Sequence, residues 1–200
     1  MVEVAPWLIV GLGNPGSEYA KNRHNVGFMA VERLVERHDL YAAWRDKFKA
    51  KVASLRIGDQ RCVVVKPQTY MNRSGQSVGP AATFHKVPVE QVVVVHDELD
   101  FPFGRVAIKR GGGHGGHNGL RDIIKHLPSP EFIRVRVGIG RPPRGQPGRD
   151  VSNWVLSDFS GDEAIALPDL VADAERAVSA ILADGVARAM NDINSQPSPS

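Results

Sequence analysis

The segment that most constrains the fold is the first apolar run and the loop that follows it. Residues 7–10 read Trp-Leu-Ile-Val, the loop Gly11-Leu-Gly-Asn-Pro-Gly16 comes next, and helical spacing of apolar residues begins at Val26. In α/β proteins, a strand that ends in such a loop and leads into a helix presents polar groups at the carboxyl end of a central strand. We therefore expect a sheet covered by helices, with the functional groups at that edge.

The rest of the chain continues this alternation of strands and helices. Residue patterns predict a helix over 26–38, a hairpin over 48–56 and 61–66, and a central strand over 91–95 that is apolar on both faces. They also predict a short helix over 78–85, strands over 105–110 and 132–139, a helix over 120–126 and one over 167–191 that is broken near Gly185. The predicted fold is α/β, a single-domain three-layer sandwich with a mixed, mostly parallel twisted sheet flanked by helices.

Length and composition limit the remaining organisation. The 200 residues suffice for one domain with a proper core, which we expect over 1–193. The Ser- and Pro-rich end, 194–200, is predicted to be a disordered tail, and the stretch 141–150, rich in Pro, Gly and Arg, a surface loop. The single cysteine, Cys62, excludes an internal disulfide and is expected to be a buried thiol, because it lies in an apolar run.

Two further features concern location and partners. The N-terminus lacks a basic region followed by an apolar core, and no apolar run approaches the roughly 20 residues of a membrane span, so we expect a cytoplasmic protein without a membrane part. The net charge is +3, and basic residues gather between Lys109 and Arg144. This cluster indicates either a surface for a polyanion or an ordinary solvated face.

The first loop formally matches the fingerprint of dinucleotide-binding proteins, Gly-x-Gly-x-x-Gly. Three details disfavour that interpretation. Pro15 and the polar run 17–24 delay the helix, the next predicted strand has no acidic residue at its end, and the motif has no role for Asn14 or His24. A nucleotide-cofactor enzyme remains a minor alternative, and no cofactor is predicted.

A second motif, His114-x-x-His117, suggests a metal site. Two histidines on a glycine-rich loop, without a cysteine or a nearby carboxylate, are weak support for a metal. Loop flexibility explains these glycines better, and no metal is predicted.

Five polar residues are expected at the carboxyl edge of the sheet. A single Asn in a turn is by default a turn former, and a single His at a helix start is usually structural. If the residues converge, however, imidazole is the natural general base, a carboxylate can orient it, and carboxamides can hold a carbonyl or a peptide backbone. No suitable Ser or Cys accompanies them, so water would be the nucleophile of a metal-free ester or amide hydrolase. The five are Asn14, His24, Asn72, Asp97 and Asn118.

Several blocks of the sequence, taken together, carry a resemblance to a known family. The chain resembles bacterial peptidyl-tRNA hydrolase in blocks that span residues 8 to 141 in the order of that family. The blocks are Val10-Gly-Leu-Gly-Asn-Pro-Gly16, Arg23-His-Asn-Val-Gly27, Lys66-Pro with Tyr70-Met-Asn72, His96-Asp-Glu-Leu-Asp100, Gly111-Gly-Gly-His-Gly-Gly-His-Asn-Gly119 and Val137-Gly-Ile-Gly140.

The resemblance implies cleavage of the ester that joins a peptide, or an N-blocked aminoacyl group, to the 3′-terminal ribose of tRNA. It implies that His24 activates water, that Asp97 orients His24, and that Asn14 helps to select N-blocked substrates. Further implied contacts are Asn72, Asn118, Tyr19 and Tyr70 for the substrate, and Lys109, Arg110, Arg134 and Arg136 for tRNA phosphates. Peptidyl-tRNA is the expected partner of a monomer that needs no other protein, and a catalytically inactive RNA-binding relative is the alternative.

Overall fold

The centre of the protein is a seven-stranded sheet in the order β2-β3-β4-β1-β5-β7-β6. The computed structural model describes residues 4–143, 145 and 150–197. The four inner strands β4, β1, β5 and β7 run parallel, while the pairings of β2 with β3, β3 with β4 and β6 with β7 are antiparallel. The strands are β1 (Trp7–Gly11), β2 (Arg45–Lys47), β3 (Ala50–Ile57), β4 (Gln60–Pro67), β5 (Val92–Glu98), β6 (Val106–Arg110) and β7 (Ile133–Gly138).

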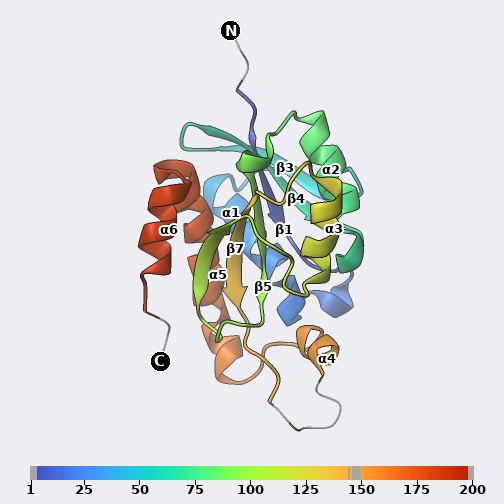
Figure 1. Ribbon diagram of the computed structural model, residues 1–200, viewed down its shortest axis with the longest axis vertical. Helices are drawn as coiled ribbons and strands as arrows, with labels where there is room; N and C mark the ends of the chain where they lie inside the picture. Colours follow the sequence, from blue (N-terminus) through green and yellow to red (C-terminus); the bar gives the residue numbers. More distant parts are fainter. Residues whose placement is uncertain (1–3, 144, 146–149, 198–200) are drawn as a thin grey trace.

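Helices cover both faces of this sheet, which confirms the predicted three-layer α/β fold (Figure 1). Side chains alternate along β1, so Ile9 packs in the core beneath α1 and α5, and Leu8 and Val10 pack in the core beneath α2 and α3. The helices are α1 (Val26–His38), α2 (Gly75–Phe84), α3 (Asn118–His126), α4 (Val151–Val155), α5 (Asp162–Asp184) and α6 (Val186–Asn194). Among the described residues, no helix is long and apolar enough to cross a membrane.

Some element boundaries differ from the prediction. Strand β5 continues through Asp97 to Glu98, and α2 begins at Gly75 rather than at residue 78. The short elements β2 and α4 were not predicted, because few residues and little apolar patterning mark them. The predicted break near Gly185 is confirmed, since that residue has φ 83° between α5 and α6.

Helix α6 includes residue 194, the first residue of the predicted tail. Asn194 is the last residue of α6, and its side chain bonds both backbone groups of Ile108, at 2.7 Å to N and 2.9 Å to O. This pairing ties the end of α6 to the edge strand β6. The tail residues 198–200, and residues 144 and 146–149 of the predicted surface loop, lie outside the described residues.

A close approach of α1 to the sheet positions the turn that precedes this helix. A Cβ at Gly27 would lie 2.4 Å from the Val95 carbonyl oxygen and 2.5 Å from the Leu12 nitrogen, so only glycine fits there without movement. The Phe28 N–H also donates to the Leu12 carbonyl at 3.1 Å. The 3₁₀ turn η2 (Arg23–Asn25), which precedes α1, is thereby held beside the carboxyl end of β5.

Candidate active site

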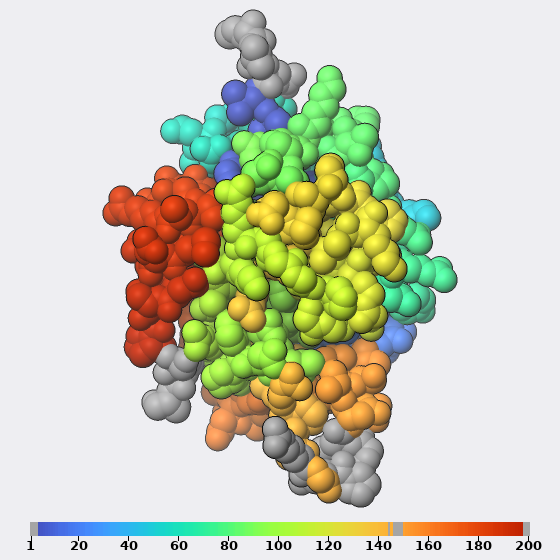
Figure 2. Space-filling model, viewed as in Figure 1, coloured from blue at the N-terminus to red at the C-terminus, as the bar shows by residue number. Residues whose placement is uncertain are grey.

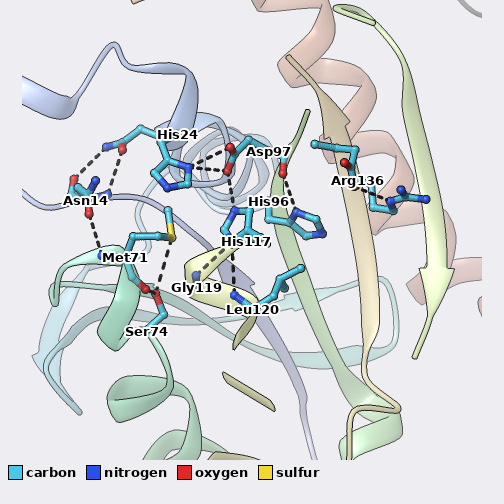
Figure 3. A network of polar contacts seen from close by, with 12 residues as sticks. Asn14, His24, Met71, Ser74, His96, Asp97, His117, Gly119, Leu120 and Arg136 are labelled. Atoms are coloured by element: carbon cyan, nitrogen blue, oxygen red, sulfur yellow. Dashed lines mark hydrogen bonds and ion pairs between the residues drawn. The ribbon is translucent and has the colours of Figure 1, made fainter. Parts of the chain in front are cut away.

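His24 and Asp97 form a buried pair at the carboxyl edge of the sheet (Figure 3). His24 comes from η2 and Asp97 from β5, and Nδ1 of His24 lies 2.9 Å from each oxygen of the Asp97 carboxylate. The two side chains are 11% and 2% exposed. The contact predicted between these residues is therefore confirmed, and both line a cavity of about 190 Å³.

A second imidazole, from a residue that was not predicted to belong to the site, reaches the same carboxylate. Nε2 of His117 lies 2.8 Å from Oδ1 of Asp97. The other ring nitrogen, Nδ1, accepts from the backbone N–H groups of Gly119 and Leu120 at 3.1 and 3.4 Å, so His117 is also the N-cap of α3. Two histidines thus donate to one carboxylate from two different loops.

These donors determine the charge of the cluster. Burial alone would raise the pKa of Asp97, but the charges and hydrogen bonds of His24 and His117 outweigh burial and hold that pKa well below its usual range. Asp97 is therefore ionised and can only accept hydrogen bonds. Consequently Nδ1 of His24 carries the proton of that bond, and a neutral His24 has its lone pair on Nε2.

The neighbouring His96 is buried as a neutral ring. Burial, followed by the charge of His117, lowers the pKa of His96 to about 3. Its Nδ1 donates to the backbone carbonyl of Asp97 at 2.8 Å, and no hydrogen-bond partner of its Nε2 occurs among the described residues. His96 therefore adds no charge to the cluster at neutral pH.

Asn14 is fixed by its surroundings on three sides. Its Oδ1 accepts from the Met71 N–H at 2.7 Å, and its backbone N–H and C=O each pair with the Asn25 carboxamide at 2.9 Å. Because Oδ1 is held as an acceptor, the carboxamide must present Nδ2 as its free donor. Asn25 was not predicted as a site residue, although it follows His24 directly in one of the blocks that resembled the family.

The remaining polar residues of the prediction are less enclosed. Asn118 lines the cavity at the start of α3, and its Oδ1 accepts from Arg121 at 2.9 Å. Asn72, next to Met71, is exposed, and the rings of Tyr19 and Tyr70 meet edge to face at 6.5 Å, with Tyr70 59% exposed. These three residues do not line the cavity with His24, so they form an outer part of the same edge.

The predicted phosphate contacts divide into two groups. Lys109 and Arg136 line the cavity, Lys109 is exposed, and Arg136 pairs with Glu98 at 2.9 Å. Arg110 is exposed but does not line the cavity. Arg134 also lines the cavity, but it is 3% exposed and its guanidinium donates to the carbonyls of residues 112 and 113. It supports the glycine loop from within instead of facing solvent.

A mixed sheet with an acid–base cluster at the carboxyl ends of its parallel strands is the arrangement of an α/β enzyme. Similarity to known proteins shows which family of α/β enzymes this is. The model of the family described as peptidyl-tRNA hydrolase matches residues 8–200. The chain belongs to the peptidyl-tRNA hydrolase family.

Individual relatives agree with this assignment over nearly the whole chain. A peptidyl-tRNA hydrolase of Sorangium cellulosum is 50% identical over 194 residues, which cover 96% of this chain and 85% of the relative. One of Bdellovibrio bacteriovorus is 44% identical over 188 residues, which cover 94% and 99%. The crystal structure of peptidyl-tRNA hydrolase from Acinetobacter baumannii matches with a TM-score of 0.87 at 42% identity, covering 98% of this chain and 97% of that one.

Proposed function

We propose that the protein hydrolyses the ester between a peptide, or an N-blocked aminoacyl group, and the 3′-terminal ribose of tRNA, which recycles tRNA from prematurely released peptidyl-tRNA. Family membership supports the reaction class. The observation that carries the proposal is the buried contact of His24 with the ionised Asp97 beside an open cavity. An RNA-binding relative without activity would need neither group.

The proposed mechanism uses His24 as the general base. Nε2 takes a proton from water while Nδ1–H donates to Asp97, whose charge stabilises the imidazolium that forms. The water oxygen adds to the ester carbonyl carbon, and the bond from that carbon to the ribose oxygen breaks. The proton on Nε2 then passes to the leaving ribose oxygen, which gives tRNA with a free hydroxyl and a peptide carboxylic acid. The acid releases the second proton of the water to solvent and becomes a carboxylate.

The carboxamides are proposed to bind the substrate without adding charge. Nδ2 of Asn14 is directed away from the Met71 N–H, so it can donate to a substrate carbonyl. Asn72 and Asn118 can bind the peptide backbone farther out, and Tyr19 and Tyr70 can border it. The proposed contacts to tRNA phosphates are three basic residues that line the cavity, Lys109, Arg134 and Arg136. Arg134 in addition holds the glycine loop in place.

The absence of a metal is also part of the proposal. Ligand atoms of His24, Asp97 and His117 lie within 4.8 Å of one another, so distance alone would allow a cation. The hydrogen bonds of His117, however, argue against a bound cation. Nδ1 of His117 accepts from two backbone N–H groups, so its Nε2 carries a proton and has no lone pair for a metal. Turnover should be unchanged in EDTA, and a loss that a divalent ion restores would contradict this.

The decisive test compares wild type with His24→Ala for hydrolysis of an N-acetylated aminoacyl-tRNA, at matched tRNA binding. Loss of the base should lower kcat by about a hundred- to ten-thousand-fold. His114→Ala is the matched control, because His114 lines the same cavity without touching Asp97, and it should retain most activity. Binding without cleavage by wild type would identify an inactive RNA-binding relative, and cleavage by His24→Ala would move the base elsewhere.

A second variant tests the role of the carboxylate. Asp97→Asn keeps the size of the side chain but offers N–H donors, which favour the tautomer of His24 with its proton on Nε2. We expect kcat to fall by about a thousand-fold or more. Action as a cytoplasmic monomer without an obligate protein partner completes the proposal, and light scattering of the purified protein tests the oligomeric state.

A further inference from the structure

We propose that Arg23 is a positioning residue, which fixes the α4 side of the cavity to the turn that carries the general base. The inference rests on the proposed function, because it concerns the cavity in which that reaction takes place. Arg23 directly precedes His24 in η2, yet its side chain points away from the Asp97 cluster and contacts residues between Ile139 and Glu163.

The guanidinium of Arg23 is nearly enclosed, and each of its three nitrogens donates a hydrogen bond. Its side chain is 3% exposed, and Nη2 lies 2.6 Å from Oε2 of Glu163. Nη1 donates to the Ile139 carbonyl at 3.4 Å and Nε to the Ser157 hydroxyl at 3.3 Å. The flat face of the group lies 3.8 Å from the ring centroid of Trp154, the distance of a cation–π contact.

Further hydrogen bonds of the backbone and of neighbouring side chains continue this attachment. The Arg23 N–H donates to the Ser157 carbonyl at 2.9 Å, and the Asn22 carboxamide donates to Asp158 at 2.8 Å. Trp154 is itself anchored, since its indole N–H donates to the Gly140 carbonyl at 2.9 Å. The turn with His24 and the segment with α4 are therefore joined by several contacts, and Arg23 makes most of them.

The opposite side of α4 faces the substrate cavity. Val151, Ser152 and Val155 line that cavity together with His24 and Asp97. Figure 2 shows the orange residues of this segment lying against the yellow-green residues of the glycine loop. Because α4 has only five residues, it depends on such outside contacts for its position. Arg23 thus sets the distance between the base and the surface that the substrate meets.

The test uses Arg23→Lys, which keeps the positive charge but loses the planar fork that stacks on Trp154 while donating in three directions. Arg37→Lys is the matched control. Arg37 of α1, like Arg23, forms an ion pair with a glutamate of α5, with Nη1 3.0 Å from Oε2 of the buried Glu175. Arg37 does not line the cavity. Both variants are measured for Tm, and for kcat and KM with N-acetylated aminoacyl-tRNA.

A displaced α4 should raise KM about 10-fold in Arg23→Lys and leave KM unchanged in Arg37→Lys. A purely structural role would lower the concentration of active enzyme, which reduces apparent kcat and not KM. Trp154→Leu should give a similar rise in KM, and the double variant should be no worse than the more impaired single variant. Unchanged KM in Arg23→Lys, or effects that multiply in the double variant, would overturn the inference.

A spectroscopic measurement observes the attachment itself. The chain has three tryptophans, so replacing Trp7 and Trp44 by Phe leaves Trp154 as the single fluorophore. In this background Arg23→Lys should increase quenching of Trp154 by acrylamide, and Arg37→Lys should not. Increased quenching with unchanged KM would show that the attachment does not matter for the substrate. If the wild type failed to cleave at all, the proposed function would fail instead, and the quenching result would still report on Arg23.

Discussion

The buried His96 predicts a specific dependence of stability on pH. The residue is 2% exposed, and burial is the main reason why the pKa of its imidazole falls from 6.5 to about 3. In the unfolded chain the same imidazole takes up a proton near pH 6.5. Between pH 6.5 and 3 the unfolded state therefore binds a proton that the folded state does not, so the free energy of unfolding must rise with pH in this window.

The size of the effect follows from these two values. Each pH unit between them is worth about 1.4 kcal/mol, so lowering the pH from 7.5 to 5.0 should cost about 2 kcal/mol through His96 alone. Asp97 adds no slope in this range, because its pKa is held below its usual range and it stays ionised in both states. An effect of 2 kcal/mol is a large part of the stability of an ordinary domain.

The assay is urea unfolding of wild type and His96→Asn at pH 7.5, 6.0 and 5.0. The Asn side chain keeps a donor for the Asp97 carbonyl but does not titrate. The loss of stability between pH 7.5 and 5.0 should therefore be about 2 kcal/mol smaller in the variant than in wild type. Val94→Ala, which weakens the fully buried core of β5 but keeps His96, should retain the wild-type slope. Parallel curves for wild type and His96→Asn would refute the reasoning.

Three further results are expected. Gly27→Ala should lower the free energy of unfolding, measured with urea, by about 3 kcal/mol, because the new Cβ would meet backbone atoms at 2.4 and 2.5 Å. Gly113→Ala is the control: a Cβ there would have no atom within 4 Å, so the free energy of unfolding should change little. Lys109→Ala should reduce the slope of log affinity for tRNA against log salt by about 1, an effect that Lys86→Ala, outside the cavity, should lack. Burial raises the pKa of Cys62 to about 12, so a thiol reagent at pH 8 should label it only after unfolding; rapid labelling of native protein would contradict its burial.

Most of the fold was predictable because its main elements carry a local signal. The run 92–95 is apolar on both faces, and the structure places it among the parallel inner strands of the mixed sheet. The strand β2 carries no such signal, since all three of its residues are exposed and it exists through pairing with β3. Likewise α4 is held by Arg23 and by its Asp150 cap, which are tertiary and local contacts that periodicity does not reveal.

The active-site pair was predictable by chemistry and topology together. His24 follows the loop after β1 and Asp97 lies at the end of β5, and the register pairs these strands side by side. His117 was not predictable in the same way, because the conformation of its glycine loop decides where the ring points, with Gly115 and Gly116 at φ 56° and 85°. The sequence identified this residue as a possible metal ligand. In the structure His117 instead donates to the Asp97 carboxylate and caps the start of α3.

The direction of hydrogen bonding through the cluster originates in that helix start. The N–H groups of Gly119 and Leu120 belong to the first turn of α3 and have no partner within the helix, so they occupy Nδ1 of His117. The proton of His117 is therefore on Nε2 and donates to Asp97, which also accepts from Nδ1 of His24. Of the ring nitrogens of His24 and His117, only Nε2 of His24 then keeps a lone pair that is free to accept a proton. The residue types alone cannot show which ring nitrogens carry the protons. The first turn of α3 decides this, and the position of that turn depends on the whole sheet.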